Sequence, residues 1–343
     1  MSNVFIAELN KYKIMIDNII ENELLEMFTQ DNIFSFMNKY YTAFRDFSKG
    51  GKRIRAYLVK LGYEMSGALD NKIIIPSLSY EIFQSGILIH DDIIDKSDLR
   101  RNMPSMHNQL GAGHLGVSKA ICTGDIGLYF AIKLIAYSDF DAKIINEAIR
   151  HQLKVFDITI SGELKDIELS VCDSYVLSDV FDMYKLKTSW YTITGPLQLG
   201  IIMGNLNSTL LNQIEEIGDL MGIAFQIKDD YLGILSNKEK IGKSNLSDMQ
   251  EGKKTILTRH FLDHASQKQE STFNEIYGNN DSSDEQLFTL QHLFSETKTF
   301  EYADTMCSQY VERAANKINI LSIEEKYKTI LLDMLKYLSS REY

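Results

Sequence analysis

The chain has 343 residues, of which 44% are hydrophobic and 24% are charged, so it is composed like an ordinary globular protein of one large or two average domains. Its net charge of −11 argues against nucleic acid as a partner. No run approaches the roughly 18 apolar residues of a membrane span, and no charged-then-apolar export signal is found, so we expect a cytoplasmic protein without a transmembrane segment.

The spacing of the apolar residues predicts helices almost throughout the chain. Apolar positions recur at helical intervals in residues 54–65 and again in residues 211–225. The chain contains only three prolines, which leaves long stretches free of helix breakers. We find no strand-like alternation and no interdomain linker. The sequence therefore predicts an all-α fold in a single domain, residues 1–343.

A glycine turn, Gly50-Gly51, leads into the basic sequence Lys52-Arg53-Ile54-Arg55. Glycines allow the backbone to approach a ligand closely, and a helix N-terminus favours an anion. If a helix begins here, Lys52 and Arg55 lie three residues apart on one face. A basic helix start on the surface is the commoner interpretation of such a segment, so an anion site depends on the motifs that follow.

Residues 91–95 read Asp-Asp-Ile-Ile-Asp within an apolar stretch. Asp91 and Asp95, four residues apart on a helix, repel each other by a few tenths of a kcal/mol, and partial burial increases this cost. A divalent cation would remove it, and ligands that are all oxygens favour Mg²⁺ over zinc. Arg100 and Arg101 follow and can bind phosphate oxygens bidentately. The apolar flanks disfavour the alternative, a solvated acidic face.

A second acidic pair, Asp229-Asp230, also follows an apolar run. The cation Lys187 precedes it, and Lys243 and Lys253 follow it in a polar segment. Together the two acidic clusters and these cations indicate a site where Mg²⁺ bridges the protein to a polyphosphate. Residues 111–116 match GxGxxG, but no strand precedes them, so we reject a dinucleotide site.

Taken in order, these motifs resemble the trans-isoprenyl diphosphate synthases, the polyprenyl synthetase family. The matching segments are residues 50–55, 89–101, 107–111, 124–125, 187–188, 225–230 and 242–255. The resemblance implies a single large helical bundle of the isoprenoid synthase type with a central cavity. It also implies a homodimeric prenyltransferase that condenses isopentenyl diphosphate head-to-tail with allylic diphosphates to give an all-trans prenyl diphosphate.

The resemblance assigns a role to each site residue. Three Mg²⁺ ions would be held by Asp91, Asp95 and Asp229. The allylic diphosphate would be bound by Arg100, Lys187 and Lys253, with Lys243 nearby. The diphosphate of isopentenyl diphosphate would be bound by Lys52, Arg55, Gln84 and Arg101. The dipoles nearest the developing allylic cation would be those of Thr188 and Gln226.

Two positions depart from the family pattern. Gly233 replaces the last carboxylate of the second acidic motif, and Asn102 replaces the glycine that usually follows the two arginines. In the family the first carboxylate of the second motif does most of the metal binding, so we still expect activity.

The product length is predicted from the helix that carries Asp91, along which the growing chain should run. One helical turn rises about 5.4 Å, close to the reach of one isoprene unit. Family members that make the C15 product carry an aromatic residue five positions before the first aspartate. Here Gly86, next to Ile87, leaves the tunnel open, and Phe83 is the next bulky residue. We therefore predict geranylgeranyl diphosphate (C20), shortened toward C15 by Gly86→Phe.

Other functions stay open from the sequence alone. The product could be the C15 or a longer polyprenyl diphosphate. A class I terpene cyclase shares the fold and the DDxxD motif, but Lys52 and Arg55 argue against it. A catalytically silent subunit of a heteromeric synthase usually loses the acidic pairs, whereas this chain keeps the first one whole.

Overall fold

The computed structural model describes residues 3–30, 34–172, 174–205, 207–235, 246–279 and 281–339. Contacts between Cα atoms divide the chain into two compact units. The first unit comprises Met1–Val155, Tyr191–Glu215 and Ser322–Ile330, and the second comprises Phe156–Trp190, Glu216–Leu321 and Leu331–Tyr343. The all-α fold is confirmed, and the single domain with a central cavity stays a prediction.

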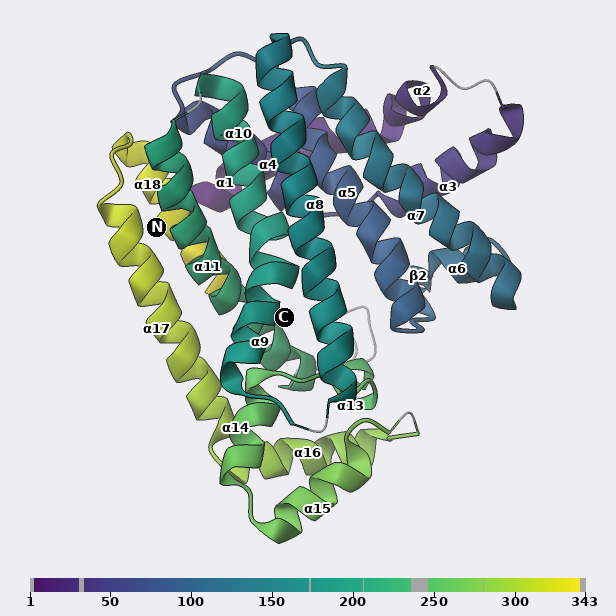
Figure 1. The fold of residues 1–343 in the computed structure, drawn as a ribbon, viewed down its shortest axis with the longest axis vertical. Helices are drawn as coiled ribbons and strands as arrows, with labels where there is room; N and C mark the ends of the chain where they lie inside the picture. Colours follow the sequence, from purple (N-terminus) through teal and green to yellow (C-terminus); the bar gives the residue numbers. More distant parts are fainter. Residues whose placement is uncertain are drawn as a thin grey trace. The chain divides into compact units, whose positions relative to one another are not determined.

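Nearly every described element is a helix (Figure 1). In the first half of the chain these are α1 (Val4–Asn22), α2 (Leu24–Thr29), the short 3₁₀ helix η1 (Ser35–Met37), α3 (Asn38–Phe47), α4 (Ile54–Met65), α5 (Ile74–Ile94), α6 (Met106–Gln109), α7 (Gly113–Ala136) and α8 (Ala142–Val171). The second half contains α9 (Leu177–Tyr184), the π-helix η2 (Lys185–Thr194), α10 (Gly195–Asn205), α11 (Ser208–Leu235), α13 (Ser247–Gln250), α14 (Ile256–His264), α15 (Gln267–Ile276), α16 (Asp284–Glu296), α17 (Thr299–Asn319) and α18 (Glu325–Ser339).

In the first unit α5 runs alongside α7, and α4 runs alongside α10 (Figure 1). Helix α5 is apolar on most of its circumference and carries fully buried side chains such as Ile82 and Phe83, as expected of a helix in the middle of a core. Its proline, Pro76, stands in the first turn, where no intrahelical hydrogen bond is lost.

Among the described residues, α7 is long and apolar enough to cross a membrane by length and composition alone. In its most apolar window 44% of the residues are buried inside the protein. A core helix of a globular protein passes the same test.

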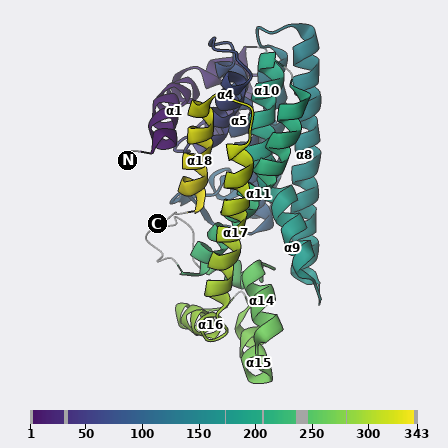
Figure 2. The ribbon, with the colours of Figure 1, turned by 90° about the vertical axis from the view of Figure 1, so that its left-hand side faces the viewer.

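The second unit has its own apolar core. Helices α14 and α16 pack against α17, and α15 packs against α16 (Figure 2). Their buried side chains, among them Phe261, Leu290 and Phe294, join those of α9 and of the later part of α11, including Tyr184 and Ile227. This core therefore supports the segment of α11 that carries the second acidic motif.

A two-stranded hairpin, β1 (Leu99–Arg100) with β2 (Met103–Pro104), was not expected from the sequence. The two residues of its turn, Arg101 and Asn102, both have positive φ, 54° and 62°. Two-residue hairpin turns of this kind require that backbone and favour Gly or Asn. Asn102, which departs from the glycine expected by the resemblance, is thus a side chain that tolerates this backbone.

Candidate active site

Asp91 and Asp95 lie at the C-terminal end of α5, where the sequence predicted a helix. Asp91 is in the last turn and Asp95 is the C-cap residue, whose backbone N–H donates to the Asp91 carbonyl at 2.8 Å. The C-terminal end of a helix carries partial negative charge, so carboxylates there are destabilised unless a cation is near. The fold thus adds a second reason for a cation at this position.

Arg100 supplies part of that positive charge. Its guanidinium donates to Asp91 at 3.0 Å and to Asp92 at 2.8 Å, and Asp92 is completely buried. Burial alone lowers the pKa of Arg100, but the hydrogen bonds and charges of Asp92 and Asp91 raise it above its usual value. In this structure Arg100, predicted to bind a diphosphate, therefore pairs with the acidic motif.

The predicted basic helix start needs one correction. Helix α4 begins at Ile54, after Arg53, which has a left-handed φ of 61°. Lys52 therefore stands in the preceding loop, and it does not share a helix face with Arg55. The sequence placed the helix start too early because a left-handed backbone at a non-glycine residue has no local sequence signal.

The guanidinium of Arg55 contacts two side chains of η2. Its Nη2 donates to the Thr192 hydroxyl at 2.8 Å, and its guanidinium lies 4.4 Å from the centre of the Tyr191 ring. Its Nε is buried and has no hydrogen-bond partner among the described residues. A buried N–H donor without a partner is costly, so this side of Arg55 is suited to accept an anionic ligand.

Arg101 lies beside the same loop and donates to the backbone carbonyls of Phe47 and Lys49. Burial lowers the pKa of Arg101, and the neighbouring guanidinium of Arg53 lowers it further. The guanidiniums of Arg100 and Arg55 act on Arg101 in the same direction, and the Glu81 carboxylate opposes them.

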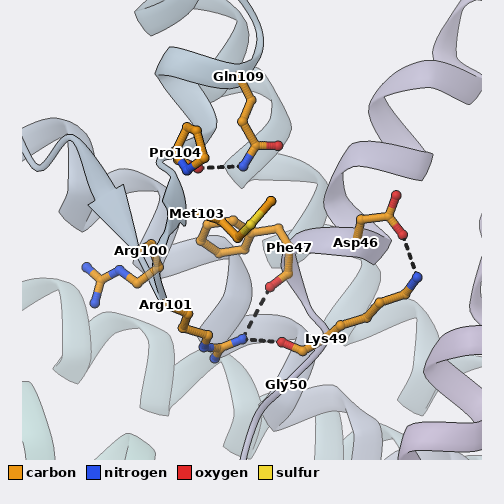
Figure 3. Close-up of a pocket in the computed structure, with 9 residues that line it drawn as sticks. All are labelled: Asp46, Phe47, Lys49, Gly50, Arg100, Arg101, Met103, Pro104 and Gln109. Atoms are coloured by element: carbon orange, nitrogen blue, oxygen red, sulfur yellow. Dashed lines mark hydrogen bonds and ion pairs between the residues drawn. The ribbon is translucent and has the colours of Figure 1, made fainter. Parts of the chain in front are cut away.

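A pocket of about 460 Å³ opens beside Arg101 (Figure 3). Its lining comes from the end of α3, the glycine turn, the hairpin and α6: Asp46, Phe47, Lys49, Gly50, Arg100, Arg101, Met103, Pro104 and Gln109. Two of the residues predicted to bind diphosphate, Arg100 and Arg101, are thus brought to one cavity.

The residues predicted to set product length all lie on α5. Phe83 is fully buried, with its ring centre 6.4 Å from that of Tyr191. Phe83, Ile87 and Asp91 follow at intervals of four, which places them along one side of the helix. Gln84, seven residues before Asp91, falls on the same side and is half-buried.

Gly86, three residues after Phe83, packs directly against α7, and its role in product length stays a prediction. A Cβ atom at Gly86 would lie 2.7 Å from the carbonyl oxygen of Gly124 and 3.2 Å from the Cα of Gly127, both on α7. The missing side chain lets α5 and α7 approach backbone to backbone. Position 86 is therefore a helix-packing position, and an open tunnel wall does not follow from its glycine.

In the second unit Lys187 and Thr188 lie on the π-helix η2. Lys187 forms ion pairs with Glu163 at 2.9 Å and with Asp166 at 2.6 Å, both from α8. Helix α8 can approach because of Gly162, where a Cβ atom would fall 2.2 Å from the backbone nitrogen of Lys187. π-Helices are rare and frequently mark functional sites; nothing in the local sequence predicted this one.

Thr188 begins a chain of hydrogen bonds. Its hydroxyl donates to Gln226 Oε1 at 2.7 Å, and Gln226 Nε2 donates to Asp230 Oδ1 at 2.8 Å. The phenol of Tyr184 donates to the other oxygen of Asp230 and accepts from the Ile256 N–H at 3.1 Å. Burial and the Asp230 charge raise the pKa of Tyr184 well above its usual value. From the sequence, Asp230 was only a member of the second acidic pair, and Tyr184 was not noticed.

The remaining predicted residues are Asp229, Lys253 and Lys243. Asp229 is half-buried on α11, next to Asp230. Lys253 pairs with Glu251 at 3.0 Å, and its carbonyl accepts a hydrogen bond from the Tyr277 hydroxyl. Lys243 lies outside the described residues.

The carboxylates Asp91, Asp95 and Asp229 provide the oxygen ligands that Mg²⁺ prefers. Within the described part of the chain, no group of three or more His, Cys, Asp or Glu side chains could hold a metal ion by itself. Mg²⁺ commonly keeps several waters and binds one or two carboxylates together with substrate phosphates. The donors therefore fit an ion shared with a phosphate ligand better than a closed protein site.

The model of the polyprenyl synthetase family matches residues 37–294. The chain belongs to this family. Membership confirms the sequence-based assignment and, with it, the expectation of an enzyme of the prenyltransferase class.

The polyprenyl synthetases most similar to this chain include two archaeal proteins. A geranylgeranyl diphosphate synthase of Methanosarcina mazei is 27% identical over 86% of this chain and 87% of its own length. A geranylfarnesyl diphosphate synthase of Aeropyrum pernix is 29% identical over 85% and 91%. Among solved structures, a Corynebacterium glutamicum geranylgeranyl pyrophosphate synthase complexed with isoprenyl diphosphate and magnesium has a TM-score of 0.90 at 26% identity, covering 97% of this chain and 99% of that one.

Proposed function

We propose that this polyprenyl synthetase is a Mg²⁺-dependent prenyltransferase that joins isopentenyl diphosphate head-to-tail to an allylic diphosphate, with geranylgeranyl diphosphate as its main product. The observation that carries the proposal is the set of guanidiniums around the glycine turn. Arg55 has a buried donor without a partner among the described residues, and the charges of Arg53, Arg100 and Arg55 act on Arg101, opposed by the Glu81 carboxylate. A diphosphate, with several charged acceptor oxygens, relieves both costs.

Within this proposal Lys52, Arg55, Gln84 and Arg101 bind the diphosphate of isopentenyl diphosphate. Arg100, Lys187, Lys253 and Lys243 bind that of the allylic substrate. Arg100 and Lys187 are paired with carboxylates in the protein. An allylic diphosphate would replace these carboxylates as the anionic partner of Arg100 and Lys187. Before the substrate binds, the carboxylates compensate the positive charge of the two side chains.

Asp91, Asp95 and Asp229 would hold Mg²⁺, and three ions are expected. Bound Mg²⁺ would stabilise the negative charge that builds up on the leaving diphosphate. The side chains of the protein would then orient the substrates, exclude water and place dipoles near the reacting atoms. Gln226 accepts the hydroxyl proton of Thr188, so the Thr188 oxygen would face the positive charge of the allylic fragment, and the departing diphosphate accepts the final proton. No general base is needed.

In this proposal, the side chains that follow Asp91 along one side of α5, toward the N-terminus of the helix, limit the length of the product. An elongating chain that starts there passes Ile87 and then reaches Phe83, about two turns or 12 Å along the helix. The relatives are named for C20 and C25 products. We place the length limit at Phe83.

We also propose a cytoplasmic homodimer. Helix α7 exposes Leu115, Ile121 and Tyr129, with 61%, 44% and 50% of their surface accessible. Exposed apolar side chains on one helix are suited to contact with another subunit.

The test uses the purified chain with radiolabelled isopentenyl diphosphate and dimethylallyl, geranyl or farnesyl diphosphate, in Mg²⁺ or in excess chelator. We expect label in a C20 diphosphate with each starter, only when Mg²⁺ is present. Conversion of an allylic diphosphate without isopentenyl diphosphate would instead identify a cyclase. No incorporation by the chain alone would contradict the proposal and favour a silent subunit.

A further inference from the structure

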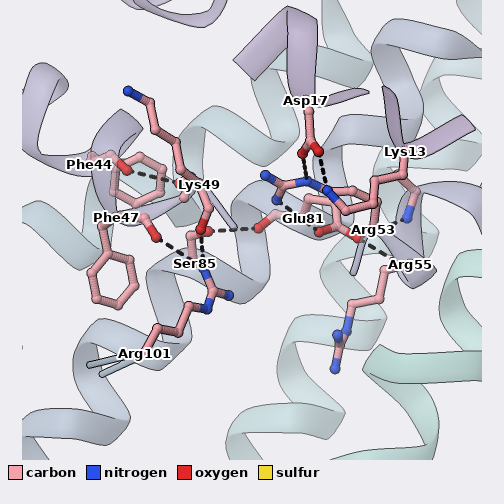
Figure 4. Close-up of polar contacts among 12 residues, drawn as sticks. Lys13, Asp17, Phe44, Phe47, Lys49, Arg53, Arg55, Glu81, Ser85 and Arg101 are labelled. Carbon is pink, nitrogen blue, oxygen red and sulfur yellow. Dashed lines mark hydrogen bonds and ion pairs between the residues drawn. The ribbon is translucent and has the colours of Figure 1, made fainter. Parts of the chain in front are cut away.

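Glu81 is a buried carboxylate to which the proposed reaction gives no role. It lies on α5 with 4% of its surface exposed. Its Oε1 accepts hydrogen bonds from the backbone N–H groups of Arg55 at 3.1 Å and Ala56 at 3.2 Å (Figure 4). These amides belong to the first turn of α4, where N–H groups have no partner within the helix. Glu81 therefore caps α4 from a different helix.

The other oxygen of Glu81 faces a buried cation. Oε2 lies 3.4 Å from Nη1 of Arg53, which is 3% exposed, and Nε of Arg53 donates to Asp17 Oδ1 of α1 at 2.7 Å. Figure 4 shows Arg53 between the two carboxylates. A buried charge is tolerated only with such partners. The Arg53 side chain is thus buried in the protein, whereas Lys52 is exposed.

The backbone of the loop depends on this arrangement. Arg53 has φ 61°, a left-handed conformation that is strained for a non-glycine residue and persists only where the surroundings hold it. The loop also passes directly over the guanidinium, because a Cβ atom at Gly51 would lie 2.8 Å from Arg53 Nη1. The second glycine of the motif therefore makes room for the ion pair between Arg53 and Glu81.

We propose that Glu81 is the positioning residue of the isopentenyl diphosphate site. Through Arg53 and the first amides of α4 it fixes the loop and the helix start from which Lys52 and Arg55 project. This inference rests on the proposed function, because the proposed function assigns isopentenyl diphosphate as the ligand of Lys52 and Arg55. Recognition of a diphosphate by several cations requires each to be held close to its productive position.

The test is the variant Glu81→Gln, which keeps the size of the side chain and an acceptor for the two amides but removes the charge opposite Arg53. Isothermal titration with isopentenyl diphosphate alone, which does not react without an allylic partner, measures the dissociation constant. We expect it to rise about tenfold. The dissociation constant for geranyl thiodiphosphate, an unreactive allylic analogue, should stay within twofold. Steady-state assays should show the same split between the two KM values, with little change in kcat.

Ser77→Ala is the matched control. The Ser77 hydroxyl hydrogen-bonds with the Tyr12 hydroxyl at 2.7 Å, a buried contact between α5 and α1 that does not touch the loop. It should lower the Tm and leave both dissociation constants unchanged. Asp17→Asn, which weakens the other side of Arg53, should weaken isopentenyl diphosphate binding in the same direction as Glu81→Gln.

The role of Glu81 is overturned if Glu81→Gln only lowers the Tm, or weakens both ligands equally. Failure of the proposed function gives a different result: a wild-type chain that binds isopentenyl diphosphate but elongates no starter. In that case the titrations still decide whether Glu81 positions the site. A wild-type chain that binds no isopentenyl diphosphate overturns both.

Discussion

Tyr184 donates a hydrogen bond to the carboxylate of Asp230, and both side chains are buried. A carboxylate can only accept, so the amide of Gln226 must present its NH₂ group to Asp230 and its oxygen to Thr188. The hydroxyl proton of Thr188 is then committed to Gln226. The lone pairs of the Thr188 oxygen remain available to a positive charge.

Tyr184→Phe removes the donor that holds Asp230. Because hydrogen bonds to charged groups contribute about 1.5–3 kcal/mol, loosening of this chain should lower kcat roughly tenfold or more. The KM values for both substrates should change less than twofold, since neither diphosphate is contacted. Tyr175→Phe is the control: it removes a buried Tyr–Thr hydrogen bond of 2.7 Å in the same unit, to Thr258. Equal losses of kcat in both variants would argue against an ordered chain.

Asp91→Asn should abolish most of the activity. The proposal places this carboxylate on Mg²⁺, and loss of one preorganised electrostatic group typically costs about 10²–10³ in kcat. The fold should survive, because Arg100 keeps its contacts with Asp92. Turnover at saturating substrate, with circular dichroism as the folding check, measures the effect. The exposed Asp139→Asn is the matched control; activity of Asp91→Asn near that of the wild type would remove Asp91 from the metal site.

Product length should respond to Ile87 and Phe83. Ile87→Phe adds bulk one turn from Asp91 and should shift the main product toward C15, whereas Phe83→Ala should allow C25 and longer chains. Chromatography of the dephosphorylated lipids gives the distribution. If neither variant changes it, the chain does not run along this side of α5.

Gly86→Ala should act on stability. Its Cβ would press against the Gly124 carbonyl at 2.7 Å, and overpacking of a tight contact costs about 1–3 kcal/mol. We expect a lower Tm with an unchanged product distribution, and Gly86→Phe should fold poorly. A stable Gly86→Phe variant with shorter products would support the role first predicted for this position.

Histidine 151 should make stability depend on pH. Burial lowers its pKa to about 4, and the hydrogen bond to the Gly195 carbonyl opposes this only in part. The unfolded chain, with a histidine pKa of about 6.5, binds more protons than the folded chain between these values. Stability should therefore fall as the pH falls from 6.5 to 4, by up to about 3 kcal/mol. Urea unfolding at pH 7 and pH 5 measures it; His151→Gln should flatten the dependence, and the exposed His292→Gln should not.

Helical periodicity and the order of charged motifs were enough to predict the fold class, the helix bearing Asp91 and the family. Side-chain direction was harder. The helix that position 86 faces depends on how α5 is rotated about its axis relative to α7, and the residues near Gly86 in the sequence do not indicate this rotation. Glu81 did carry a signal, as a carboxylate in a mostly apolar segment, but its partner Arg53 is 28 residues away, and Asp17, which binds the other side of Arg53, is 64 residues from Glu81. Long-range pairs of this kind emerge only from the folded chain.

The π-helix η2 has a consequence for insertions and deletions. A π-helical turn accommodates about one residue more than an α-helical turn, so deleting one residue between Lys185 and Thr194 could restore ordinary α-helix there. Each residue of an α-helix turns the chain by about 100°. Such a deletion would give a more regular helix in which Thr188 no longer faces Gln226. The π-helical backbone therefore keeps Thr188 opposite Gln226. A chain shortened by one residue in η2 would have a more regular helix and would lose this contact.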